Sequence, residues 1–312
     1  MERLAPTWEV SLVVGHVDHG LRAQSREEAE LVRALALARG LRFYGHRLTL
    51  DPGAGLPARA RAARRAALLE QAQQANARFI ALGHTATDQS ETVLMHLVRG
   101  AGLKGLGGMQ PFDPPWMRPL LRLTRAETRA LADRLAIPYV DDPTNILRTH
   151  LRVRMREDVL ARLRDENSNV EQAIVSAARL VRDAEFALEA VVMQEEQRRR
   201  KSDALGSDGR SPVASTREAR QRMAWDVDGL GALPRAVRTR LVRRIAQVAG
   251  VDDECLGHLV VDTIDKAVLA RARSRFAGGP GYRARAWDLA SGVRLHLDGS
   301  GLWVERSESP NH

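Results

Sequence analysis

Cysteine is almost absent from this sequence of 312 residues, in which Cys255 is the single example. One cysteine excludes a disulfide scaffold, a cysteine-built zinc site and a C-x-x-C redox pair. Long apolar runs are lacking too, because no stretch approaches the length of a transmembrane helix and the amino terminus has no apolar signal core. We therefore expect a cytoplasmic protein without disulfides and without a membrane partner.

Lysine is also scarce, since only Lys104, Lys201 and Lys266 occur among 48 lysine and arginine residues. The chain is nevertheless basic, with a formal net charge of +9. Such an excess suits a polyanionic partner, most simply nucleic acid, although arginine bias can also reflect codon usage. A chain of 312 residues is long enough for two domains, each with its own core.

The most informative stretch runs from residue 79 to residue 109. It opens with an apolar run that predicts a buried strand, and His84 follows at the strand's carboxyl end. A helical pattern begins after Thr85, and Asp88 and Glu91 share one face of its first turn. In open α/β sheets, ligands bind at this edge. These side chains form a candidate site, although Thr85 and Asp88 also fit a capping box, which is a common structural pattern.

The same stretch resembles a known family. Residues 84–94 read H-T-A-T-D-Q-S-E-T-V-L, and residues 99–109 read R-G-A-G-L-K-G-L-G-G-M. These runs are similar to H-x-A-D-D-Q-x-E-T and R-G-S-G-L-x-G-L in the tRNA(Ile)-lysidine synthetases, which are PP-loop ATP pyrophosphatases. The resemblance implies an α/β fold, with a parallel-sheet PP-loop ATPase domain over residues 1–165. Residues 166–312 are then a mostly helical domain that binds tRNA or substrate.

A second segment implies adenine-nucleotide contacts. A strand predicted over residues 8–14 ends at G-H-V-D-H-G, where the family has H-V-x-H-G-L-R. By this resemblance His16, Val17 and His19 contact the nucleotide, and Gly83 does so from the other strand end. The spacing H-x-x-H also permits a metal site, which we regard as the weaker interpretation.

A third segment implies phosphate contacts. The helix predicted over residues 58–76, after Pro57, matches the family's A-R-x-x-R-Y at Arg61 and Arg64. The second arginine contacts the nucleotide's phosphates in the family, which makes Arg64 the candidate. Two positions depart from the pattern: Arg65 replaces the usual tyrosine, and Pro57 stands at the usual glutamate.

An arginine cluster follows D-D-P-T-N at residues 141–145, which is close to the family's E-D-P-S-N. Its members are Arg148, Arg152, Arg154 and Arg156. An arginine run is commonly a solvated surface, but here we favour tRNA-binding contacts to phosphates. Leu147 and Val153 replace an aspartate and an asparagine that are usual in the family.

The remaining patterns complete the expected order of elements. Helices are predicted over residues 25–39, 124–135, 170–200, 234–249 and 254–272. Strands are predicted over residues 41–48 and 137–140. Residues 201–216 are predicted to form a flexible loop, because they are rich in serine, glycine and aspartate. The alternating residues 292–304, with Asp298-Gly299 at the turn, predict a short C-terminal β-hairpin.

One family motif has no counterpart. PP-loop enzymes bind pyrophosphate with S-G-G-x-D-S between the first strand and the first helix, where glycines let backbone N–H groups approach the phosphates. The sequence contains no such run, and the strand that should come second begins near Trp8. We expect a truncated sheet lacking the first strand, loop and helix, through a misplaced start codon or a truncated gene. The misplaced start is the preferred interpretation, and the chain as written is expected to be inactive or nearly so.

The resemblance also implies a reaction. Lysidine synthetases use ATP to adenylate the C2 oxygen of the wobble cytidine in a minor isoleucine tRNA with a CAU anticodon. The ε-amine of L-lysine then attacks C2 and displaces AMP. Asp88 and Glu91 are the candidates to orient and deprotonate the ammonium group, or to hold Mg²⁺, with Asp88 as the possible metal ligand. His84 is a candidate for proton transfer or phosphate binding, and Arg64 for offsetting phosphate charge.

Three alternatives stay open. A tRNA thiolase of the same superfamily would share the ATP chemistry but needs catalytic cysteines, and Cys255 lies far from the site in the sequence. An amidotransferase-linked synthetase lacks the R-G-x-G-L-x-G-L context. A noncatalytic tRNA-binding remnant is the alternative from a different functional class. The oligomeric state is expected to be a monomer or a homodimer.

Overall fold

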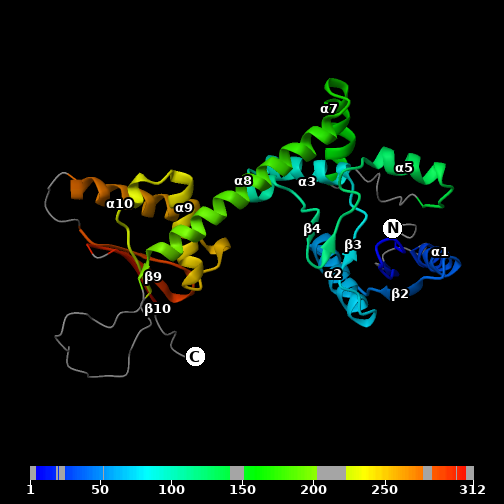
Figure 1. The fold of residues 1–312 in the computed structure, drawn as a ribbon, viewed down its shortest axis with the longest axis horizontal. Helices are drawn as coiled ribbons and strands as arrows, with labels where there is room; N and C mark the ends of the chain where they lie inside the picture. Colours follow the sequence, from blue (N-terminus) through cyan, green and yellow to red (C-terminus); the bar gives the residue numbers. More distant parts are fainter. Residues whose placement is uncertain are drawn as a thin grey trace. The chain divides into compact units, whose positions relative to one another are not determined.

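The computed structural model describes residues 5–18, 20, 25–51, 53–140, 151–201, 223–276, 283–299 and 301–306. The chain divides into two compact units, Met1–Arg182 and Asp183–His312 (Figure 1). The predicted domain boundary near residue 165 stays a prediction. Within the described residues, no helix combines the length and the apolar character needed to cross a membrane.

The amino-terminal unit begins with two parallel strands connected through a helix. Its first elements are β1 (Val13–Asp18), α1 (Ser25–Ala38), β2 (Arg42–Arg47) and α2 (Leu56–Gln74). The helices and the second strand confirm their predictions. The first strand was predicted too early in the chain: Trp8 and Val10 are apolar but exposed, so they are not packed as a strand of a core sheet is. β1 instead extends to Asp18 and includes His16 and Val17.

A second small sheet carries the central stretch. Its elements are β3 (Ile80–Ala81), α3 (Ala86–Val98), α4 (Leu103–Leu106), β4 (Phe112–Asp113) and β5 (Trp116–Met117). β3 runs parallel to β5, whereas β4 runs antiparallel to it. The strand–turn–helix order predicted around His84 is confirmed, but the predicted burial of the strand is wrong, because Phe79 is exposed and neither residue of β3 is buried. Among the described residues β1 and β3 belong to separate sheets, so the parallel sheet is present as two short pieces.

Helix α5 (Arg125–Arg134) begins as predicted. The Thr124 hydroxyl accepts the Glu127 N–H at 3.1 Å, and the Glu127 carboxylate accepts the Thr124 N–H at 2.7 Å. The strand predicted over residues 137–140 is wrong, because these residues are exposed and pair with no strand in the described structure. Residues 141–150 lie outside the described part of the chain.

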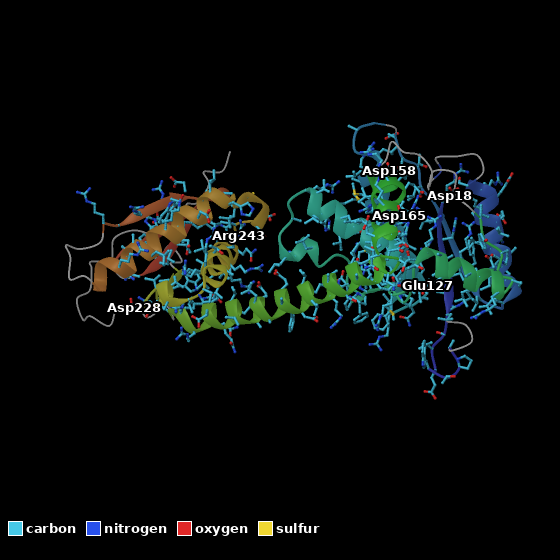
Figure 2. All side chains as sticks on the ribbon, turned by 90° about the horizontal axis from the view of Figure 1, so that it is seen from above. Asp18, Glu127, Asp158, Asp165, Asp228 and Arg243 are labelled. Atoms are coloured by element: carbon cyan, nitrogen blue, oxygen red, sulfur yellow. The ribbon has the colours of Figure 1, made fainter. Side chains whose placement is uncertain are left out.

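A series of helical elements closes this unit, interrupted after Glu166 by the extended residue Asn167. It comprises α6 (Leu151–Arg154), a π-helical turn (Met155–Leu160), α7 (Ala161–Glu166) and the first part of α8 (Val170–Arg199). Figure 2 labels Asp158 on the π-helical turn and Asp165 on α7. The predicted long helix over residues 170–200 is confirmed.

The carboxyl-terminal unit combines helices with an antiparallel sheet. Its helices after α8 are α9 (Arg235–Val248) and α10 (His258–Phe276). Its strands are β6 (Arg200–Lys201), β7 (Met223–Trp225), β8 (Arg285–Asp288), β9 (Val293–Leu297) and β10 (Leu302–Arg306). They form one sheet in the order β6-β7-β10-β9-β8. Most of the loop predicted over residues 201–216 lies outside the described residues, which resume at Met223.

This sheet is larger than the short hairpin that was expected, whereas the expected helices of the unit are present. The hairpin itself is confirmed, since Leu297 pairs with Leu302 across the turn. Val293, Leu295 and Leu297 of β9 are all buried, as the alternating pattern requires. The short strand β7 gave no comparable pattern, yet Trp225 at its end is fully buried and donates its indole N–H to Glu196 at 2.8 Å.

Candidate functional site

Asp88 uses its two carboxylate oxygens for different neighbours. Oδ2 accepts the Thr85 backbone N–H and the Thr85 hydroxyl, both at 2.8 Å, which completes a capping box at the start of α3. Oδ1 accepts a hydrogen bond from Nη2 of Arg152 at 3.2 Å. Helix capping therefore uses one oxygen of Asp88 and leaves the other in contact with Arg152, so the functional role of Asp88 stays a prediction.

Glu91 lies one turn further along α3 and is almost completely buried. Its Oε2 accepts from Nε of Arg152 at 2.5 Å, and its Oε1 lies 3.5 Å from Nη1 of Arg156. Burial is the main cause that raises the pKa of Glu91, while the charge and hydrogen bond of Arg152 oppose that shift. The carboxylate is thus desolvated but paired, so it holds both guanidinium groups in place.

The arginine cluster separates into two faces. Arg152 and Arg156 are four residues apart and both contact the carboxylates of α3, whereas Arg154 is exposed between them. Arg148 lies outside the described residues. Two of the arginines proposed to bind tRNA therefore contact the candidate catalytic carboxylates, and Arg154 alone of the described three faces solvent.

His84 and Arg64 bring unpaired buried nitrogens to this site. Nδ1 of His84 and Nε of Arg64 are buried and have no hydrogen-bond partner among the described residues. Burial chiefly lowers the pKa of His84, and Asp88 opposes this effect. Three positive charges lower that pKa further, those of Arg118, Arg152 and Arg64. Burial and these positive charges therefore favour the neutral imidazole of His84.

The proposed adenine-nucleotide residues lie on another strand end. His16 and Val17 belong to β1, and the His16 ring stacks on Phe43 with centroids 6.4 Å apart. The His16 carbonyl accepts a hydrogen bond from Gln71 at 3.0 Å, and burial lowers the pKa of the His16 imidazole. His19 lies outside the described residues. Gly83 precedes His84 in an open position, where an added Cβ would meet no atom within 4 Å.

Sequence reasoning missed Gln89, which is fully buried and binds the glycine-rich segment after α3. Its Oε1 accepts the Met109 N–H at 2.8 Å, and its Nε2 donates to the Met109 carbonyl at 3.1 Å. Arg182 of α8 also donates to the carbonyls of Gly107 and Met109. The matched motif contains this glutamine, but its partner lies 20 residues away and gives no local signal.

Thr87, also on α3, links the site to later elements. Its hydroxyl donates to Oε1 of the buried Glu171 at 2.5 Å and accepts the Arg125 N–H at 3.0 Å. Arg164 pairs with the same Glu171 carboxylate at 2.9 Å. The start of α3, which carries the candidate site, is therefore fixed to α5, α7 and α8 by buried polar contacts.

The described residues do not form a metal site by themselves. Within the described ranges, no group of three or more His, Cys, Asp or Glu side chains is arranged to hold a metal ion. Asp88 offers one carboxylate oxygen that Arg152 already contacts. The second part of the H-x-x-H pattern, His19, lies beyond the part of the chain that the structure describes.

Comparison with known proteins identifies the family. Residues 1–163 match the model of the PP-loop domain. A tRNA(Ile)-lysidine synthase of Thermobifida fusca is 35% identical over 271 residues, covering 86% of this chain and 77% of that protein. The chain belongs to the tRNA(Ile)-lysidine synthase family. This confirms the resemblance seen in residues 84–109.

Other members of the family differ in how much of their length is matched. The tRNA(Ile)-lysidine synthase of Solibacter usitatus is 35% identical over 287 residues, covering 89% of this chain but 61% of its own length. That of Mycobacterium tuberculosis is 34% identical over 242 residues, or 77% of this chain and 68% of the relative. A U34-tRNA thiolase structure from Methanococcus maripaludis aligns with a TM-score of 0.47 and 18% identity over 57% of this chain and 66% of its own. That structural likeness is too weak to support a functional statement.

Proposed function

We propose that this lysidine synthase family member ligates lysine to C2 of the wobble cytidine in a minor isoleucine tRNA with a CAU anticodon. Family membership supports the reaction class. The observation that carries the proposal is the arrangement of His84, Asp88 and Glu91 beside Arg152, at the carboxyl end of β3. This edge is where an open α/β sheet binds its ligands.

The residues of the site fit the phosphates of ATP. Arg64 and His84 each have a buried nitrogen without a partner, and a phosphate oxygen satisfies such donors. By family resemblance His16, Val17, His19 and Gly83 are the proposed contacts of the adenine nucleotide. Asp88 is the residue that would hold Mg²⁺, and the metal would offset charge on the phosphates.

The two carboxylates have different proposed roles. In the first step the C2 oxygen of cytidine bonds to the α-phosphorus of ATP and pyrophosphate leaves. In the second step the lysine ε-nitrogen bonds to C2, and the C2–O bond breaks to release AMP. Asp88, whose Oδ1 faces the site, attracts the ammonium group and accepts a proton. Glu91 holds Arg152 and Arg156 beside the negative charge that develops on the departing phosphate.

The test is lysine incorporation into tRNA by the Glu91→Gln variant, made in the version of the protein that carries any codons lying in frame upstream of Met1. We expect the variant to lose about 100-fold in rate, the loss that accompanies removal of one preorganised donor to developing charge, because Arg152 and Arg156 would lose the carboxylate that holds them. Glu166→Gln is the matched control, because Glu166 is an exposed carboxylate at the end of α7. Radiolabelled lysine in tRNA measures the product, and wild-type activity in Glu91→Gln contradicts the assignment.

The noncatalytic tRNA-binding alternative is separated by assaying two versions of the protein. One is the 312-residue chain, and the other adds any codons that lie in frame upstream. Lysine incorporation by either version supports the ligase. Tight binding of the isoleucine tRNA by both, without pyrophosphate release or lysine incorporation by either, contradicts the ligase and favours the RNA-binding alternative. Transfer of sulfur to tRNA instead would identify another PP-loop tRNA-modifying activity.

A further inference from the structure

Arg118 occupies a position that the family motifs did not single out. It directly follows β5, whose carboxyl end lies beside that of β3, because the Leu82 N–H donates to the Met117 carbonyl at 2.8 Å. Arg118 and His84 therefore emerge from neighbouring parallel strands at the same edge of the sheet. Arg118 is 8% exposed, which is unusual for an arginine.

The buried guanidinium of Arg118 is only partly satisfied. Its Nη1 donates to the Gln110 carbonyl at 2.7 Å, but its Nε is buried and has no hydrogen-bond partner among the described residues. Burial lowers the pKa of Arg118, and the charge of Asp113 opposes this without forming a close ion pair. A buried cation without a paired carboxylate is costly, and an anionic ligand would offset that cost.

The surroundings of Arg118 are strongly positive. Arg118, Arg64 and Arg152 all lower the pKa of His84, so three guanidinium charges act on one imidazole. The two carboxylates of α3 are already in contact with Arg152 and Arg156. Arg64, Arg118 and His84 thus each have an unpaired buried nitrogen in a region where positive charge exceeds negative charge.

We propose that Arg118 is a ligand-contacting residue that, with Arg64 and His84, forms a binding site for a phosphate group. The ligand class is a phosphate or pyrophosphate oxyanion, whose oxygens accept from the unpaired nitrogens. The inference rests on the proposed function for the source of that group, which is either the nucleotide or the RNA backbone. The competing interpretation is that Arg118 only holds the Gln110 carbonyl and contacts no ligand.

The test is calorimetric titration of the 312-residue chain with inorganic pyrophosphate. We expect Arg118→Ala and Arg64→Ala each to weaken binding by about 10- to 100-fold, the loss that accompanies removal of a charged hydrogen bond. Arg118→Lys keeps the charge and should lose less. Arg122→Ala removes an exposed arginine four residues further along and serves as the matched control. Unchanged affinity in Arg118→Ala, or no binding by the wild-type chain, overturns the proposal.

A second readout uses the wild-type chain and does not depend on the folding of a variant. The His84 imidazole is followed by NMR during a pH titration with and without pyrophosphate. A phosphate bound beside the ring should raise the pKa of His84, because an adjacent anion favours the charged form. Pyrophosphate binding that leaves the pKa of His84 unchanged contradicts the proposed location of the ligand.

Competition identifies the source of the phosphate. Displacement of pyrophosphate by ATP assigns the site to the nucleotide, and displacement by an RNA hairpin assigns it to the RNA backbone. Neither measurement needs lysine or catalysis, so the phosphate site can be contradicted without contradicting the ligase activity. If the protein incorporates lysine and Arg118→Ala leaves the pyrophosphate affinity unchanged, only the proposed phosphate site is contradicted. If Arg118→Ala weakens pyrophosphate binding but the wild-type protein never incorporates lysine, only the proposed ligase activity is contradicted.

Discussion

Three of the four proposed catalytic residues lie close together in the sequence, and this is why a local pattern could nominate them. His84, Asp88 and Glu91 lie within eight residues on a strand end and the first helical turns. Their partners were not predictable in the same way, because Arg152 is 61 residues from Glu91 and Arg118 follows a two-residue strand. Local patterns indicate which side chains share one face of a helix, whereas tertiary packing decides which charged side chains from distant segments pair with them.

A first prediction concerns the pH dependence of stability at Glu91. Its folded-state pKa is raised above 4.5, so its contribution is present below pH 4.5 and is lost as the pH rises through the folded-state pKa. The free energy of unfolding of wild type should therefore fall relative to Glu91→Gln as the pH rises above 4.5. Urea denaturation of both proteins between pH 3.5 and 7 measures this difference.

Glu127 gives the matched comparison with the opposite sign. Hydrogen bonds from Thr124 lower its pKa below 4.5, so its contribution is present above pH 4.5 and is lost as the pH falls. Wild type should therefore lose stability relative to Glu127→Gln only at acidic pH. Parallel pH profiles for the two variants would contradict both assignments.

At the scale of elements, sequence patterns found the helices well and the short strands poorly. Thr85 and Thr124 mark helix starts through capping boxes, which depend on residues three positions apart. The two-residue strands β3, β4 and β5 depend on pairing partners that are distant in the sequence. Residues 137–140 were predicted as a strand from apolar content, but they are exposed and find no pairing partner in the described structure.

A second prediction concerns the attachment of the glycine-rich segment to α3. Gln89→Ala removes the acceptor of the Met109 N–H, so we expect hydrogen exchange at this amide to accelerate roughly tenfold or more. Gln73→Ala changes an exposed glutamine of α2 and serves as the control. Exchange at Met109 that is equally slow in both variants would show that Gln89 does not hold the segment.

A third prediction separates two glycines of the β9–β10 turn. Gly301 has φ +144° and an added Cβ would lie against the Trp225 carbonyl oxygen, so Gly301→Ala should destabilise the carboxyl-terminal unit by about 1–3 kcal/mol. Gly299 has no atom within 4 Å of an added Cβ, so Gly299→Ala should change stability by less than about 0.5 kcal/mol. Thermal unfolding compares the two, and equal effects would rule out the steric explanation.

For the whole molecule, the net charge gives less information than the way the arginines are used. Several buried or half-buried arginines pair within the chain, as Arg238 does with Asp265 at 2.7 Å and Arg240 with Glu185 at 2.6 Å. Arg199 donates to the carbonyl of Asp228, which Figure 2 labels in the carboxyl-terminal unit. Composition therefore predicted a polyanionic partner but not which arginines are available to it.

A fourth prediction assigns RNA contact to the exposed Arg154. If it neutralises one phosphate, Arg154→Ala should lower the slope of log K against log salt for tRNA binding by about 0.7–0.9. Arg33→Ala removes the same charge from α1, where Arg33 pairs loosely with Glu30 at 3.7 Å, and should leave the slope unchanged. Filter binding at several salt concentrations measures both variants. A slope for Arg154→Ala identical to that of wild type would show that Arg154 does not contact an RNA phosphate.

Because the Thr87 hydroxyl donates a hydrogen bond to Glu171, the effect of a substitution at one of these positions should depend on the residue at the other. The family signature has aspartate where this chain has Thr87, so Thr87→Asp would restore the family residue. In this structure Thr87→Asp would place a second carboxylate against the buried Glu171, whose oxygen lies 2.5 Å from the Thr87 hydroxyl. Thr87→Asp alone should therefore lower the free energy of unfolding, and adding Glu171→Gln should restore it, as urea denaturation of both variants would measure. The effect of a substitution at Thr87 thus depends on the residue 84 positions later.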